Sequence, residues 1–142
     1  MGSWRPSTHT RVSISDFLRE RLHGRAFVTV GNPHGVSGAD TVFHYHVGDD
    51  LITADYHGGR VAHGHVIGRA TGHDTIATLY HSLTTDGELL AGWSRGRVGV
   101  DAEGRTTLTF EWAWLSGAEG GGESAYVELV TPVNSSGLDP RR

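Results

Sequence analysis

Hydrophobic and polar residues alternate along most of this chain, most clearly between Asp40 and Gly68. Three alternating segments there, DTVFHYHV, LITADYH and RVAHGHVIG, are separated by GDD and by Gly58-Gly59. Alternation of this length is typical of half-buried strands, and short turns rich in glycine join antiparallel neighbours. Similar segments occupy 25–30, 75–83, 88–100, 105–116 and 123–131. We therefore predict an all-β chain of about eight strands in sequential antiparallel order.

Closing such a sheet into an up-and-down barrel removes the exposed edges of an open sheet, so a closed antiparallel β-barrel is the predicted architecture. Ser15 is predicted to cap one short N-terminal helix, which ends at Gly24 and covers one end of the barrel. We assign 1–14 to a flexible arm, 15–131 to a single β-barrel domain and 132–142 to a flexible tail.

The turns also predict which side chains share a face, because the register of a hairpin follows from its loop length. We take Gly58-Gly59 as a two-residue loop, and 71–74 and 101–104 as four-residue loops. TTDG, at 84–87, is the turn between the segments 75–83 and 88–100. The predicted interior then collects Phe43, Tyr45, Ile52, Tyr56, His63, His65, Ile76, Tyr80, Leu89, Trp93, Arg95, Leu108, Phe110, Trp112 and Trp114. The predicted outer face collects His44, His46, Asp55, His57, His81 and Glu111. One β-bulge would invert every assignment downstream of it.

Composition narrows the classes of function. The chain has 142 residues, a net charge of -4 with neutral histidines, and no cysteine. An acidic balance argues against a nucleic-acid partner, and the absence of cysteine excludes disulfides and thiolate chemistry. No apolar run reaches the length of a membrane span, and the first residues lack the apolar core of a signal peptide. We expect no membrane partner and a cytoplasmic location.

Histidines are the first candidates for chemistry. His63 and His65 share one side of a strand, and with His44, His46 and His57 they suggest a metal site. The predicted register divides these histidines between two faces and places no carboxylate beside the inner pair. We therefore predict no metal and no other cofactor, and interpret the histidines as surface or hydrogen-bonded core residues.

Several motifs resemble a family of short bacterial proteins often labelled "N-acetylglutamate synthase". They are Phe43-His44-Tyr45-His46, Asp55-Tyr56-x-Gly58-Gly59, Gly64-x-x-x-Gly68, Asp86-Gly87-Glu88 and Trp112-x-Trp114-x-Ser116-Gly117, and the likeness covers roughly Gly24 to Leu129. The resemblance implies a fold similar to calycins and lipocalins. Acetyltransferases of the labelled activity use an α/β fold with a glycine-rich loop, and this sequence has neither. The chain also departs from the family pattern at Phe110 and Ser82.

Two classes of function remain. The first is a cofactor-independent cyclase or isomerase that folds a hydrophobic natural-product intermediate, an analogy with barrel enzymes of antibiotic biosynthesis and other secondary metabolism. The second is a non-catalytic carrier or sensor of an apolar ligand. An interior proton-transfer group would favour the enzyme, so we predict His65, Tyr80 and Arg95 as catalytic residues. Predicted substrate-binding residues are Phe43, Tyr45, Tyr56, His63, Trp93, Phe110, Trp112 and Trp114. A homodimer is compatible with the sequence.

Overall fold

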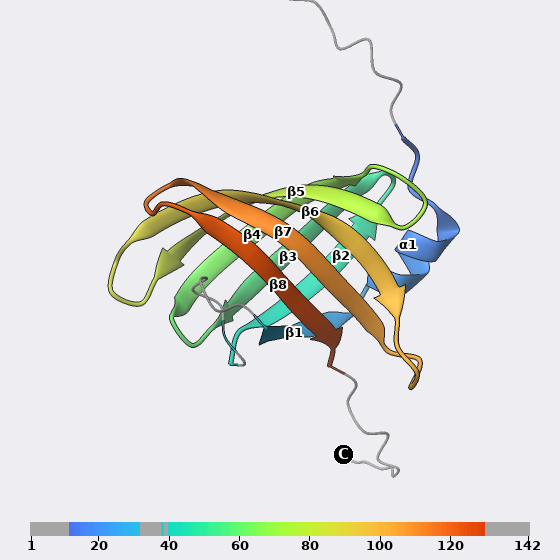
Figure 1. Ribbon diagram of the computed structural model, residues 1–142, viewed down its shortest axis with the longest axis horizontal. Helices are drawn as coiled ribbons and strands as arrows, with labels where there is room; N and C mark the ends of the chain where they lie inside the picture. Colours follow the sequence, from blue (N-terminus) through green and yellow to red (C-terminus); the bar gives the residue numbers. More distant parts are fainter. Residues whose placement is uncertain (1–11, 32–37, 39, 130–142) are drawn as a thin grey trace, which may run out of the picture.

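Each of the alternating segments forms a strand in the computed structural model, which describes residues 12–31, 38 and 40–129 (Figure 1). The strands of this part of the chain are β1 (Ala26–Gly31), β2 (Val42–Gly48), β3 (Leu51–Gly58), β4 (Val61–Ala70), β5 (Thr75–Thr84), β6 (Leu89–Val100), β7 (Thr106–Ser116) and β8 (Gly121–Glu128). Each strand pairs antiparallel with the next, and β8 pairs with β1. The predicted closed up-and-down barrel is confirmed.

One short helix, α1 (Asp16–Leu22), covers one end of the barrel (Figure 1). Ser15 caps the helix by accepting a hydrogen bond from the backbone N–H of Leu18 at 3.0 Å, as predicted. Leu18 and Leu22 are fully buried in the same core as the inward side chains of the strands. The helix therefore fills this end of the barrel with apolar side chains.

Three loops hold α1 in place. Ser15 donates to the carbonyl of His73, Arg19 to that of Asp49 and Arg21 to that of Gly104, at 2.6, 2.8 and 3.1 Å. These acceptors lie in the loops that precede β5, β3 and β7. The three strands therefore start at the helix-covered end and finish at the other.

The hairpin between β3 and β4 differs from the prediction in two ways. Gly58 pairs with Val61, so the turn contains Gly59 and Arg60. Further along, Tyr56 pairs with Gly64, which leaves one extra residue in β4 around Ala62. A bulge of this kind flips the faces of the strand beyond it. The predicted interior position is therefore wrong for His63 and His65, which lie on the outer face.

The next loops are each one residue longer than predicted. Ala70 pairs with Ile76, a shift that cancels the bulge and returns Ile76 and Tyr80 to the interior. Leu83 pairs with Leu89, and the predicted interior position is wrong for the outward residues Leu89, Trp93 and Arg95. Val100 pairs with Thr106, so the loop contains 101–105 and the aromatic residues of β7 face inward again.

The remaining predicted faces are confirmed. The interior holds Phe43, Tyr45, Ile52, Tyr56, Ile76, Tyr80, Leu108, Phe110, Trp112 and Trp114. His44, His46, Asp55, His57, His81 and Glu111 are exposed. Most of the predicted arm and the whole predicted tail at 132–142 lie outside the described residues. Within the described part of the chain, no helix is long and apolar enough to cross a membrane.

Candidate functional site

Aromatic side chains gather in the half of the barrel interior that α1 does not fill. We call this group the aromatic cluster, and it consists of Phe43, Tyr56, Tyr80, Phe110, Trp112, Trp114 and Tyr126. Tyr56 and Trp114 come from the last residues of β3 and β7, and Tyr80 comes from the second half of β5. All three strands end away from the helix. The cluster therefore lies toward the uncovered end.

On one side of the cluster, four rings pack in a chain. Phe43 stacks on Tyr56 with ring centroids 4.5 Å apart. Tyr126 meets the rings of Phe43 and Phe110 edge to face, at 5.2 and 5.7 Å. Such contacts fix ring orientation beyond what simple burial provides. This wall of the interior is therefore rigid and apolar, with hydroxyl groups at its edges.

The other side contains two tryptophans. Trp112 and Trp114 pack edge to face at 5.2 Å, and Tyr80 packs against Trp114 at 6.1 Å. Trp112 is only 5% exposed, whereas Trp114 and Tyr80 are half-buried. Trp114 and Tyr80 are thus the members of this group that an entering molecule meets first.

Glycines in the neighbouring strands make room for two tyrosine rings. Gly64 lies opposite Tyr56 and Gly92 lies opposite Tyr80 in the sheet register. A side chain at either glycine would overlap the tyrosine ring beside it. Each ring therefore lies over its neighbouring strand, which is the close approach that glycine permits.

The polar groups of the interior are mainly hydroxyls. Thr78 and Ser94 share a hydrogen bond of 2.6 Å, and the Tyr56 hydroxyl donates to the carbonyl of His81 at 3.3 Å. The indole Nε1 of Trp112 is buried and has no acceptor among the described residues. An unsatisfied buried donor costs about 1 to 3 kcal/mol.

Burial keeps the tyrosines of the interior protonated. Loss of hydration raises the pKa of Tyr56 to about 12, and it also raises the pKa of Tyr80 and of Tyr45, which packs beside Phe27. The inward positions of β2 to β7 carry no charged residue. Glu128 of β8 is paired with Arg25, which also donates to the carbonyl of Glu20 in α1, at the helix-covered end. The aromatic cluster is therefore uncharged at neutral pH.

Two of the predicted catalytic residues lie on the outer wall and have partners there. His65 Nδ1 is 3.0 Å from the Asp55 carboxylate. Arg95 pairs with Glu111 at 3.1 Å and lies over the Trp93 ring at 5.5 Å. Of the predicted catalytic set, only Tyr80 faces the interior. His63 and Trp93, predicted to bind substrate, also lie outside, while the other predicted binding residues face inward.

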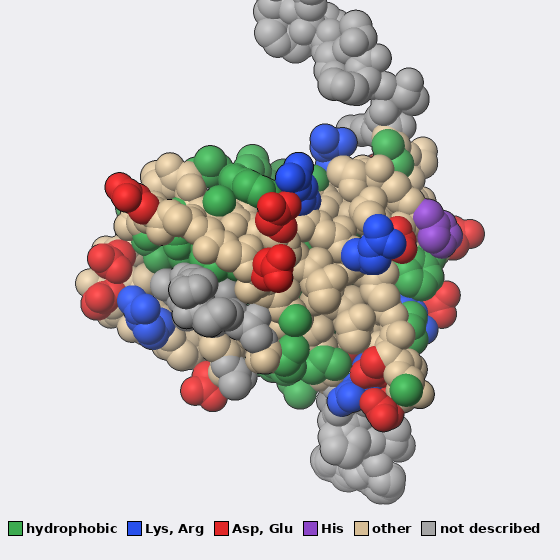
Figure 2. Space-filling model, in the orientation of Figure 1, with side chains coloured by type: hydrophobic (Ala, Val, Ile, Leu, Met, Phe, Trp, Pro, Cys, Tyr) green, Lys and Arg blue, Asp and Glu red, His purple; other side chains and the backbone are tan. Residues whose placement is uncertain are grey.

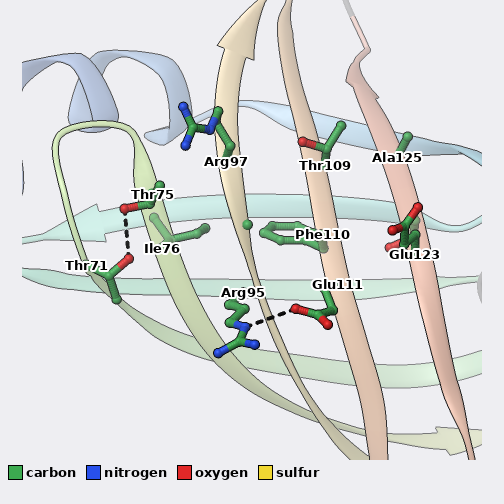
Figure 3. A pocket seen from close by; sticks show the side chains of 12 residues that line it. Thr71, Thr75, Ile76, Arg95, Arg97, Thr109, Phe110, Glu111, Glu123 and Ala125 are labelled. Atoms are coloured by element: carbon green, nitrogen blue, oxygen red, sulfur yellow. Dashed lines mark hydrogen bonds and ion pairs between the residues drawn. The ribbon is translucent and has the colours of Figure 1, made fainter.

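An open groove of about 910 Å³ lies on the outer wall across β5 to β8 (Figure 3). Its charged groups include Arg95, Arg97, Glu111 and Glu123, and Arg97 pairs with Asp74 at 3.3 Å. Acidic and basic side chains are intermixed on this face of the molecule (Figure 2). Exposed pairs of this kind contribute little to stability, and their mutual neutralisation leaves no strong field for a charged ligand.

Sequence reasoning missed Tyr126, Ser94 and Ser124. The predicted faces were assigned only as far as β7. After the glycine turn, polar and apolar residues alternate again at Ser124, Ala125 and Tyr126, and this pattern would have extended the assignment to β8. Ser94 was missed because the loop before β6 is one residue longer than assumed. Within the described residues, no three histidine, aspartate or glutamate side chains converge in a way that could hold a metal ion.

Comparison with known proteins identifies a family. A protein-family model described as avidin-like protein matches residues 20–129, which is most of the barrel, so the chain belongs to this family of calycin-type barrels. The match supports the predicted calycin-like fold but gives no support to the label "N-acetylglutamate synthase". No curated protein matches the chain. No solved structure matches it either.

Proposed function

We propose that this member of the avidin-like family binds an uncharged small molecule against the aromatic cluster. The observation that carries the proposal is the contrast between many aromatic walls and no charged residue at the inward positions of β2 to β7. Aromatic walls with a few polar groups are typical of sites for flat, largely apolar ligands. A charged ligand would lose its hydration without gaining an ionic partner.

Trp112 supplies a reason for the ligand to carry a hydrogen-bond acceptor. Its buried Nε1–H has no acceptor among the described residues, and Trp114 packs against its ring. A carbonyl or ether oxygen on the ligand would satisfy this donor and recover part of its desolvation cost. Because the nitrogen is buried, a ligand reaches it only if the neighbouring side chains move.

A binding protein is favoured over an acid–base enzyme by the positions of the predicted catalytic residues. His65 and Arg95 point away from the interior, and burial raises the pKa of Tyr80, which makes its hydroxyl a poor proton donor. A cyclase that used the same aromatic walls would have to act by holding the substrate in a reactive shape. We therefore propose a carrier or sensor.

Two dyes test the proposal. Nile red is neutral and carries a carbonyl, whereas anilinonaphthalene sulfonate is an aromatic anion. We expect Nile red to bind saturably and to accept energy from tryptophan, and the anion to bind at least 10-fold more weakly, since burial of an unpaired charge is costly. Equal binding of both dyes, or no binding of Nile red, would contradict an uncharged interior site.

A second apolar surface requires a control in this experiment. Leu51, Ile67, Leu79 and Trp93 line a groove of about 570 Å³ on the outer wall, where a dye could also bind. Leu79→Ser places a polar side chain in this groove without touching the interior, because Leu79 is 54% exposed. Nile red binding that survives Leu79→Ser belongs to the interior, and binding that disappears belongs to the outer groove.

A further inference from the structure

The bulge in β4 brings His65 to the same outer face as His44, Asp55 and His81. In the sheet register His44 pairs with Asp55, Asp55 with His65, and His65 with His81. These four side chains form one row across β2, β3, β4 and β5. The predicted division of the histidines between two faces, which argued against a metal, does not hold for this row.

His65 and His81 lie close enough to share a ligand. They are directly opposite each other on neighbouring strands, where Cβ atoms are about 4.5 to 5.5 Å apart. Their ring centroids are 5.9 Å apart, with an angle of 43° between the rings. His81 is exposed and the His65 side chain is 40% exposed, so an ion in solution can reach both.

Asp55 orients the His65 ring. Its carboxylate oxygen Oδ1 lies 3.0 Å from His65 Nδ1. A carboxylate accepts a hydrogen bond from a nitrogen that carries a proton. The contact therefore favours the tautomer with Nδ1–H and leaves the lone pair of Nε2 free. A carboxylate that holds a histidine in this way is the usual support of a metal-ligating imidazole. His44 and His57, by comparison, are diagonal neighbours with ring centroids 6.2 Å apart.

We propose that His65 and His81 form a binding site for a divalent transition-metal ion, with Asp55 as a positioning residue. Imidazole pairs suit Cu²⁺, Ni²⁺ and Zn²⁺, and Cu²⁺ binds tightest in this series. No third ligating side chain converges with these two among the described residues, so water fills the other coordination positions. The site lies outside the barrel and is independent of the ligand proposed for the interior.

Calorimetric titration of the full chain with Cu²⁺ and with Zn²⁺ tests the site. We expect saturable binding, tighter for Cu²⁺, that is weakened in His65→Gln and in His81→Gln. His46→Gln is the matched control, because His46 is another exposed histidine of the same outer face but packs near His23. It should bind like the unmodified chain. Equal weakening by all three substitutions would mean diffuse binding by many histidines and would overturn the proposal.

Two further measurements separate this site from a surface ion pair. Asp55→Asn should weaken Cu²⁺ binding by roughly 10- to 100-fold, as loss of a supporting carboxylate does, while the metal-free chain keeps its melting temperature. Electron paramagnetic resonance of the Cu²⁺ complex should show two coordinated imidazole nitrogens in the unmodified chain and one in His81→Gln. Unchanged spectra in His81→Gln would exclude His81 as a ligand and overturn the proposal.

Discussion

The helix-covered half and the aromatic half of the barrel interior are built by the same strands but from different residues. In the first half, Leu18, Leu22 and Ile76 are fully buried and carry no polar side-chain atom. In the second, Tyr80 and Trp114 are half-buried, and Trp112 keeps a donor without an acceptor among the described residues. Fully buried apolar side chains of this kind stabilise the fold and offer no surface to a ligand. A half with unsatisfied and partly exposed groups can also bind a ligand.

The largest effect that this comparison predicts is on stability, at the helix-covered end. Leu22→Ala removes a fully buried side chain without lowering helix propensity, so it should reduce the unfolding free energy by about 2 to 5 kcal/mol. Leu79→Ala on the outer wall, where Leu79 is 54% exposed, should change it by less than about 0.5 kcal/mol. Urea denaturation measures both. A small effect at Leu22 would mean that α1 does not contribute to the core.

Alkaline pH should weaken the fold through the tyrosines of both halves. Burial raises the pKa of Tyr45, Tyr56 and Tyr80, whereas an unfolded tyrosine ionises near pH 10. Below about pH 10 the tyrosines are protonated in both the folded and the unfolded chain, so stability does not change. Above about pH 10 the unfolded chain binds fewer protons than the folded chain. Above it, stability falls by about 1.4 kcal/mol per pH unit for each tyrosine that stays protonated.

Urea denaturation at several alkaline pH values measures this slope. Tyr45→Phe should make the slope shallower by about 1.4 kcal/mol per pH unit, which is the contribution of one tyrosine. Tyrosinate absorbance supplies the check, since the folded protein should ionise well above pH 10. Ionisation of all the tyrosines near pH 10 without unfolding would contradict their burial.

A smaller effect is expected where β8 closes against β1. Glu128 is 2.7 Å from Arg25 and accepts the backbone N–H of Thr106 at 2.9 Å. Partial burial acts to raise the pKa of Glu128, but the Thr106 N–H and the Arg25 guanidinium outweigh burial and lower it. The stabilisation is therefore present above about pH 4.3 and is lost as the pH falls through the lowered folded pKa.

Glu128→Gln tests this contact at neutral pH and should cost about 1 to 3 kcal/mol. Glu103→Gln is the control, because Glu103 is an exposed partner of Arg105 with 69% of its side chain in solvent. It should change stability by less than about 0.5 kcal/mol. If both substitutions cost the same, the closure of the barrel does not depend on Glu128.

The sequence predicted the barrel well because alternation and glycine turns are local signals. Phe43, Tyr45 and Tyr56 were placed correctly, and the pairing of β2 with β3 contains no bulge. Loop lengths were not readable to one residue, and a bulge has no distinct sequence mark. Each such error exchanged the two faces, so Trp93 replaced Ser94 and His65 replaced Gly64 in the predicted interior. Pairs of errors cancelled, which is why Tyr80 and Trp112 were still predicted to face inward.

Trp114 and Trp93 offer the most direct test of the aromatic half as a ligand site. Both are partly exposed tryptophans, but Trp114 belongs to the aromatic cluster and Trp93 to the outer wall. The measurement is the dissociation constant of Nile red for Trp114→Ala and Trp93→Ala in a Leu79→Ser background. Loss of an aromatic contact worth about 0.5 to 1.5 kcal/mol should weaken binding by roughly 2- to 12-fold for Trp114→Ala, with no change for Trp93→Ala. Equal affinities of the two variants, or a loss confined to Trp93→Ala, would contradict binding inside the barrel.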